Sequence, residues 1–282
     1  MQTLAAHHKQ DKYLHQWIGM ILAAVVFWSV ESLAEPVQAT RILYYNPEIS
    51  IDNFLALEEK FNQFLADKGT IRFIPNNSVD AFEKTMGSKT PEETSFLISS
   101  WYYKTLRNST PLRPLLIGAR KERSSQKKLL VSRKGENERS DNINIASATS
   151  QDFATQLLAE MSVQTGKWKP KKFSILRVPK DLDALMSVAF KMSDAALASE
   201  HGWNHLRQIN PTQFEQLQVL AESKEIPLPV LAVKASKTDR SVELMNLFLT
   251  MNQSEKGETA LRLIGLDQFR PPSPAEEQFL NQ

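Results

Sequence analysis

Histidine supplies one arrangement in this sequence with the spacing of a metal chelate. His201 and His205 are four residues apart, which would place both rings on one face of a helix. No third ligand and no glutamate at the offset of a zinc protease accompanies them. We therefore interpret the pair as exposed side chains on a loop-like stretch around Gly202, and we expect no metal site.

Hydroxyl groups in front of a predicted helix suggest a different chemistry, the binding of an oxyanion. Thr149 and Ser150 precede a segment whose apolar residues recur at helical spacing, and Ser150 is the expected N-cap. A helix N-terminus offers unpaired N–H groups and the positive end of a dipole to an anion. Asp152 in the first turn opposes this, because its carboxylate competes for the same dipole.

Motifs for catalysis are absent from the sequence. It contains no G-x-S-x-G motif, no P-loop and no G-x-G-x-x-G. Cysteine is absent too, which excludes disulfides, thiolate ligands, a cysteine nucleophile and a lipidated cysteine anchor. Because no nucleophile and base stand in a recognisable pattern, we expect no catalytic residue and no cofactor. We interpret the chain as a binding protein rather than an enzyme.

Strands and helices alternate along the part of the chain that must position these residues. Apolar spacings of three, four and seven predict a helix over residues 51–65, between β-forming segments at 41–45 and 70–74. A strand, a helix and a strand in this order imply a parallel pair. Further strands are expected at residues 95–99, 143–146, 173–178, 195–198, 217–221 and 227–233, and further helices at 101–106, 150–161, 182–189, 242–251 and 260–264. The proline-rich segment 269–274 is expected to be irregular.

This order predicts a two-lobed α/β fold with doubly wound sheets joined by two crossover strands. We expect lobe one to comprise residues 40–131 and 232–282, and lobe two to comprise residues 132–231. The crossings, near 129–132 and 230–233, should act as a hinge.

The N-terminal segment predicts export. A charge-free, largely apolar run at residues 17–30 follows Lys9 and Lys12, and small residues precede Glu35 and Thr40. A basic region, a short apolar region and such a cleavage site describe a signal peptide, here residues 1–39, and hence a periplasmic protein. An uncleaved signal anchor is the alternative, although the run is short for a membrane span.

The charge pattern does not favour a nucleic-acid partner. The formal net charge is only +2, with 23% charged residues. Basic clusters occur at residues 113–139 and 167–180, but aromatic residues hardly interleave with them. We interpret the clusters as a solvated surface, or as a docking face for an anionic partner or a membrane.

Four phrases resemble the type 2 periplasmic solute-binding proteins, in particular the phosphonate/phosphite branch of ABC-transporter substrate-binding proteins. Asp194-Ala-Ala is similar to the family's D-A-A/G strand, and residues 217–223 (LQVLAES) to its L-R-V-I-A-E-S. Residues 226–233 (IPLPVLAV) resemble its return strand, and residues 257–269 its closing G-x-x-A-L-x-x-L-G-I-D-x-F. The resemblance implies two lobes with the ligand in the cleft between them.

The resemblance also implies ligand contacts in lobe one. Ser99, Ser100 and Tyr103 stand where the family has G-P-x-x-Y, so that Tyr103 matches and the two serines do not. Hydroxyl groups here would contribute neutral hydrogen-bond donors to an oxyanion.

In lobe two, Thr149 and Ser150 match the family's S-T-S-G, and Gln151 replaces its glycine. Ser199 stands where phosphonate binders place an acid for the ligand amine, with Glu200 beside it. Both departures bear on which ligand the cleft accepts.

The resemblance implies a monomer that captures a small anionic solute, phosphonate- or phosphite-like, and delivers it to an ABC permease. The alternative keeps the fold but reuses the cleft, as a sensing or interaction domain of an envelope signalling assembly. The fold does not separate these functions, because one fold supports many.

Overall fold

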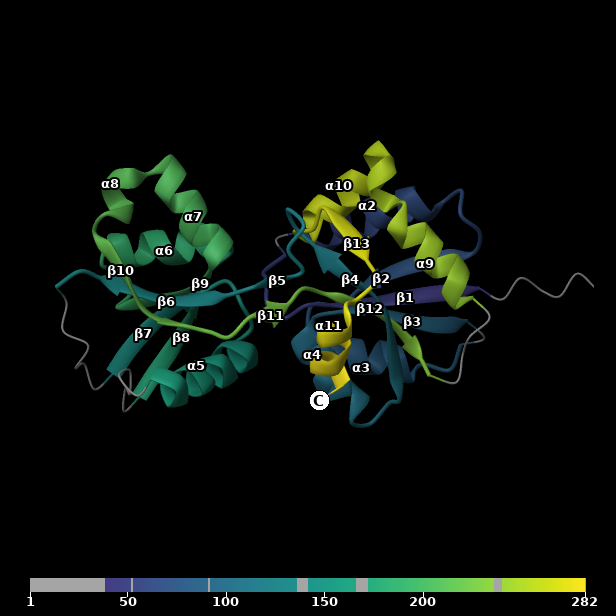
Figure 1. Ribbon diagram of the computed structural model, residues 1–282, viewed down its shortest axis with the longest axis horizontal. Coiled ribbons are helices and arrows are strands. Elements are labelled where there is room, and N and C mark those ends of the chain that lie inside the picture. The colour runs from purple at the N-terminus through teal and green to yellow at the C-terminus, as the bar shows by residue number, and fades with distance from the viewer. Residues whose placement is uncertain are drawn as a thin grey trace, which may run out of the picture. The chain divides into compact units, whose positions relative to one another are not determined.

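The computed structural model describes residues 39–51, 53–90, 92–135, 142–165, 172–235 and 240–281 (Figure 1). The predicted signal peptide lies outside the described residues, apart from its last residue. No helix in these ranges is long and apolar enough to cross a membrane.

A six-stranded sheet has the order β13-β4-β12-β3-β1-β2. Its strands are β1 (Thr40–Tyr45), β2 (Ile71–Pro75), β3 (Glu93–Ile98), β4 (Leu112–Ala119), β12 (Val230–Lys234) and β13 (Gln268–Arg270). β1 pairs in parallel with β2 and β3, as the strand–helix–strand pattern predicts, whereas β12 is antiparallel to β3 and β4. All six residues of β1 are buried, because helices cover both faces of the sheet.

Two apolar cores lie on the two faces of this sheet. Figure 1 shows the helices that cover each face. One core packs under α2 (Phe54–Leu65), α9 (Ser241–Leu249) and α10 (Glu255–Leu263), with the short 3₁₀ helix η1 (Met251–Gln253) between the last two. The other packs under α3 (Val79–Gly87), α4 (Ser100–Arg107) and α11 (Pro274–Asn281).

A second sheet, of five strands, has the order β10-β6-β9-β7-β8. Its strands are β6 (Lys128–Arg133), β7 (Asn142–Ser147), β8 (Lys172–Arg177), β9 (Ala195–Ser199) and β10 (Leu217–Glu222). One face carries α5 (Gln151–Thr165), and the other carries α6 (Asp181–Ala189), α7 (Glu200–Ile209) and α8 (Pro211–Phe214). Each sheet therefore has its own pair of cores.

The chain passes between the two sheets twice. The passing segments pair with each other as a two-stranded antiparallel ribbon of β5 (Ser125–Gln126) and β11 (Ile226–Pro227). Residues 129–132 and 230–233, expected to be the crossings, instead lie inside the five-stranded and six-stranded sheets, because their apolar side chains are buried. The limits of the two lobes stay a prediction.

Two stretches that we expected to be irregular contain regular elements, although residues 271–273 of the tail lie in no helix or strand. His201 and His205 lie on α7 with ring centroids 6.4 Å apart, so the loop interpretation is wrong. Gly202 fits this helix because α7 lies against α6, where a Cβ at this position would come within 2.6 Å of the Asp181 Cβ. The tail contains β13 and α11, and Pro274 occupies the first turn of α11, where a helix tolerates the missing N–H. Among the described residues, no group of three potential ligands is arranged for a metal ion.

Candidate functional site

The serines at the start of α4 are buried and hydrogen-bonded. Ser99 is the N-cap of α4, and its hydroxyl oxygen accepts from the Tyr102 N–H at 3.1 Å. The Ser100 hydroxyl donates to the Pro227 carbonyl oxygen of β11 at 2.6 Å. The start of α4 is thereby attached to one of the two passing segments.

Thr149 and Ser150 form the start of α5. The Ser150 hydroxyl oxygen accepts from the Phe153 N–H at 3.3 Å, as expected of the N-cap, and Thr149 Oγ1 lies 2.8 Å from Ser147 Oγ. The Ser150 N–H donates to the Pro47 carbonyl oxygen at 2.7 Å. Pro47 follows β1, so this bond joins the start of α5 to the six-stranded sheet.

Tyr103 and Ser199 make their hydrogen bonds to residues outside the start of α5. Tyr103 is fully buried in the core beneath α4, and its hydroxyl donates to the Leu112 carbonyl oxygen at 3.3 Å. Ser199 is the N-cap of α7, accepting from the Gly202 N–H at 3.0 Å, and it pairs in the sheet with Lys128. Ligand contact by any of the six predicted residues stays a prediction.

A buried carboxylate that the sequence analysis did not single out lies among these residues. Glu48 stands in the turn after β1 and is only 2% exposed. Its N–H donates to Asn46 Oδ1 at 3.0 Å, which holds the turn. Lys128 Nζ donates to the Glu48 carbonyl oxygen at 3.0 Å. Lys128 itself is 1% exposed, although it belongs to the basic cluster that we interpreted as surface.

The Glu48 carboxyl group lies at the N-terminus of α4. Burial raises its pKa to about 7, against the positive charge of Lys128 and hydrogen bonds from the Trp101 backbone amide and the Gln126 and Ser99 side chains. One carboxylate oxygen, Oε1, is buried without a hydrogen-bond partner. A carboxylate therefore takes the place that a helix N-terminus would offer to an oxyanion.

The turn after β1 thus meets the N-termini of two helices. We call residues Asn46, Pro47 and Glu48 the β1 turn. Glu48 faces the start of α4, and the Pro47 carbonyl oxygen faces the start of α5. The sequence does contain a signal for this place, since ligands of open α/β sheets bind beyond the carboxyl ends of parallel strands, where the β1 turn stands.

Two cavities lie at the starts of α4 and α5, and the first of them is also lined by Asn46 and Pro47 of the β1 turn. One, of about 230 Å³, is lined from the six-stranded side by Tyr45 and Asn76 and from the five-stranded side by Ser150, Asp152 and Arg177. Burial and the charge of Asp152 raise the pKa of Tyr45 to about 12, against the charge of Arg177.

The other cavity, of about 460 Å³, is lined by α4, α5, β11 and α11. Trp101 and Phe153 meet in it edge to face, with ring centroids 5.7 Å apart. Lys104 Nζ lies 3.5 Å from the centre of the Phe279 ring. This volume is in the range of small-molecule sites.

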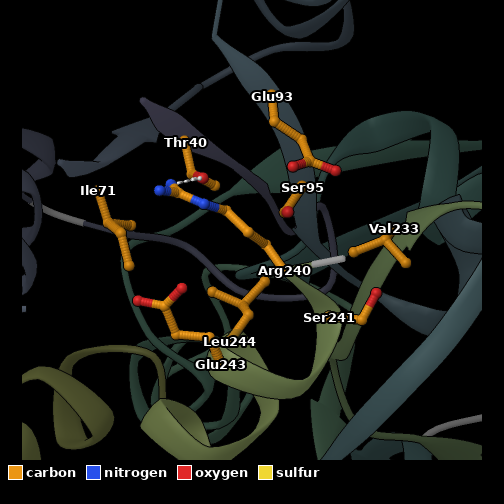
Figure 2. Close-up of a pocket in the computed structure, with 9 residues that line it drawn as sticks. All are labelled: Thr40, Ile71, Glu93, Ser95, Val233, Arg240, Ser241, Glu243 and Leu244. Atoms are coloured by element: carbon orange, nitrogen blue, oxygen red, sulfur yellow. Dashed lines mark hydrogen bonds between the residues drawn. The ribbon is translucent and has the colours of Figure 1, made fainter. Parts of the chain in front are cut away.

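A third cavity lies at the opposite ends of the β1 and β3 strands (Figure 2). It has a volume of about 10 Å³, room for about one water molecule. Arg240 Nη1 donates to Thr40 Oγ1 at 3.0 Å across it, and Glu93 and Glu243 lie nearby (Figure 2). It is too small to hold a solute.

Comparison with known families identifies the chain. The sequence model of the family described as "ABC transporter, phosphonate, periplasmic substrate-binding protein" matches residues 97–277. The chain belongs to this family. It is a substrate-binding protein of the phosphonate ABC-transporter type and not an enzyme, as its sequence predicts. The family implies a small solute and an ABC permease as partners, and a periplasmic location is typical of it.

Solved structures share the fold. A Xanthomonas citri protein bound to ATP is 14% identical with a TM-score of 0.62, and the match covers 86% of this chain and 94% of that one. A binding protein component of an ABC phosphonate transporter from Pseudomonas aeruginosa is 13% identical (TM-score 0.61, coverage 86% and 84%). PhnD1 from Prochlorococcus marinus in complex with methylphosphonate is 14% identical (TM-score 0.58, coverage 86% and 96%). This likeness confirms the predicted two-lobed α/β fold. Comparison with curated proteins finds no match.

Proposed function

We propose that the chain captures a small oxyanion, phosphonate- or phosphite-like, at the N-termini of α4 and α5 and delivers it to an ABC permease. One observation carries the proposal: the start of α4 already holds a carboxylate, that of Glu48, beside Lys128. Groups that hold one oxyanion hold another of similar shape, because the N–H donors, the hydroxyl and the positive charge act on any negative oxygen.

In this proposal each sheet contributes one half of the site. The six-stranded sheet supplies Ser99 and the start of α4, and the five-stranded sheet supplies Thr149 and Ser150 at the start of α5. β5 and β11 form the hinge, since they are the two passing segments and each sheet keeps its own cores. Rotation about this hinge would open and close the site without disturbing either core.

A binding screen followed by one double substitution tests the proposal. The full chain is exported, purified and titrated by calorimetry with phosphate, phosphite, methylphosphonate, sulfonates and amino acids. Thr149→Ala with Ser150→Ala should weaken the binding of the oxyanion found at least tenfold, about 1.4 kcal/mol. Unchanged affinity would refute the assignment of this site.

Ser150 also caps α5, so a matched control separates lost capping from lost contact. Ser254→Ala removes the same kind of cap from α10, where Ser254 Oγ accepts from the Gly257 N–H at 3.1 Å. It should lower the melting temperature by a similar amount, since an N-cap contributes about 1 kcal/mol, and leave affinity unchanged.

A second candidate function is a sensing or interaction domain in an envelope signalling assembly. The β1 turn favours it, because its own groups already engage both helix N-termini. This function predicts that no solute in the screen binds, and that the gene stands beside a kinase or cyclase gene rather than beside permease and ATPase genes.

A further inference from the structure

The environment of Glu48 is unusual for a carboxylate with a purely structural role. The residue is 2% exposed, yet Oε1 has no hydrogen-bond partner. Burying a charged group is unfavourable unless it is paired and fully hydrogen-bonded, and a structural carboxylate would be expected to have every oxygen satisfied. The unpaired oxygen therefore offsets part of the stabilisation that the other contacts of the Glu48 carboxylate contribute.

The neighbours of Glu48 are the groups that an anion site needs. The Trp101 amide and the Ser99 side chain belong to the N-terminus of α4, while Lys128 and Gln126 come from β6 and β5. Ser99 is one of the residues predicted to contact the ligand. The carboxylate and a bound oxyanion would therefore use the same donors.

Both cannot be present together as anions. Two negative charges at hydrogen-bonding separation in a site shielded from water repel each other strongly, so that one must leave or take up a proton. We infer that Glu48 is an internal competitor for the anion site, and that an oxyanion binds by displacing or neutralising its carboxylate. This inference rests on the proposed function and adds to it how the same site is regulated.

The β1 turn that carries Glu48 is also bonded to the five-stranded side through two of its backbone carbonyl oxygens. The Pro47 carbonyl oxygen accepts from the Ser150 N–H at 2.7 Å, and Lys128 holds the Glu48 carbonyl oxygen at 3.0 Å. Because these two bonds join the β1 turn to the five-stranded sheet, a ligand that expels the turn replaces these cross-connections with its own. Ligand binding is thereby coupled to the contact between the sheets.

The competition makes binding depend on pH. Lys128 from β6 and Tyr44 from β1 are the charged or titratable groups that face the carboxyl, and Tyr44 stays neutral because burial raises its pKa. With the Glu48 pKa at about 7, the protonated share falls about tenfold between pH 6 and pH 8. The affinity for an anion that does not itself titrate should fall by the same factor.

Two variants test the inference. Glu48→Gln keeps the volume and removes the charge, and Glu48→Ala vacates the place of the carboxylate. Glu215→Gln, on an exposed residue, is the control for the change in net charge. Calorimetry with methylphosphonate and with methanesulfonate, which stays singly charged, is run at pH 6 and pH 8, and melting temperatures are recorded with and without inorganic sulfate.

We expect methanesulfonate to bind the wild type about tenfold more weakly at pH 8 than at pH 6. The affinity of Glu48→Gln should not change between these pH values. At pH 8 this variant should therefore bind methanesulfonate about tenfold more tightly than the wild type does. Sulfate should raise the melting temperature of Glu48→Ala by more than that of the wild type or of Glu215→Gln, because both of these keep the competing carboxylate.

The outcomes separate the inference from the proposed function. If no solute binds the wild type but sulfate stabilises Glu48→Ala, solute capture fails and the internal competitor stands. If solutes bind the wild type and both Glu48 variants equally, with the same pH dependence, capture stands and the competitor is refuted. If sulfate leaves Glu48→Ala unaffected and no variant gains affinity, the inference is overturned.

Discussion

Replacing Glu48 with glutamine should change how the stability of the protein depends on pH. Burial raises the pKa of this carboxyl from 4.5 to about 7 in the native state. The native state therefore binds the proton more tightly than the unfolded chain, so the group's stabilising contribution is complete below about pH 4.5 and is lost as the pH rises through about 7. The difference, 7 minus 4.5, is about 2.5 pKa units, or about 3 kcal/mol. As the pH rises, the free energy of unfolding of the wild type should therefore fall by about 3 kcal/mol relative to that of Glu48→Gln.

Urea unfolding at pH values between 4.5 and 8 measures this difference. Glutamine resembles the protonated carboxyl in size and cannot ionise, so other titrating groups cancel when the two free energies of unfolding are subtracted. Glu215→Gln should give a curve parallel to that of the wild type, because this residue is exposed. A wild-type curve parallel to that of Glu48→Gln would refute the reasoning, since the carboxyl would then titrate alike in both states.

Two further substitutions test the packing of the six-stranded sheet. Phe61→Ala should lower the free energy of unfolding by about 3–5 kcal/mol in urea titrations, because the fully buried ring stacks on Phe73 with centroids 3.9 Å apart. A loss below about 1 kcal/mol would contradict this packing. Gly257→Ala should lower the melting temperature, because its Cβ would lie 1.9 Å from the Met251 carbonyl oxygen, whereas Gly87→Ala, with nothing within 4 Å, should not. Equal melting temperatures would show that the close approach at Gly257 is absent.

Segments whose own residues decide their structure were predicted well from the sequence. The helix expected at residues 51–65 is α2, because the apolar stripe that faces the core repeats at helical spacing. The expected cap of α5 is Ser150, because a hydroxyl at that place satisfies a backbone N–H wherever the helix packs. Both predictions depend on contacts a few residues apart along the chain.

Predictions were wrong where a distant contact decides. The glycine at position 202 suggested a loop, but α7 continues through it because α6 lies too close for a side chain. The prolines after Phe269 suggested an irregular tail, and only residues 271–273 are irregular: β13 pairs with β4, and Pro274 begins α11 at a position that needs no N–H donor. In both cases the neighbour that decides is far away in the sequence.

The sequence by itself determined the alternation of strands and helices, the hydroxyl groups at the helix N-termini and the family. It did not determine what those N-termini face. Glu48 is a charged residue in a turn, and Lys128 lies 80 residues away in a basic cluster, so local pattern predicts solvent exposure for both. Only the pairing of the passing segments brings β6 beside the β1 turn and removes both groups from water. Burial and the resulting electrostatics depend on that tertiary arrangement, because a charge is shielded from water by residues distant from it in the chain.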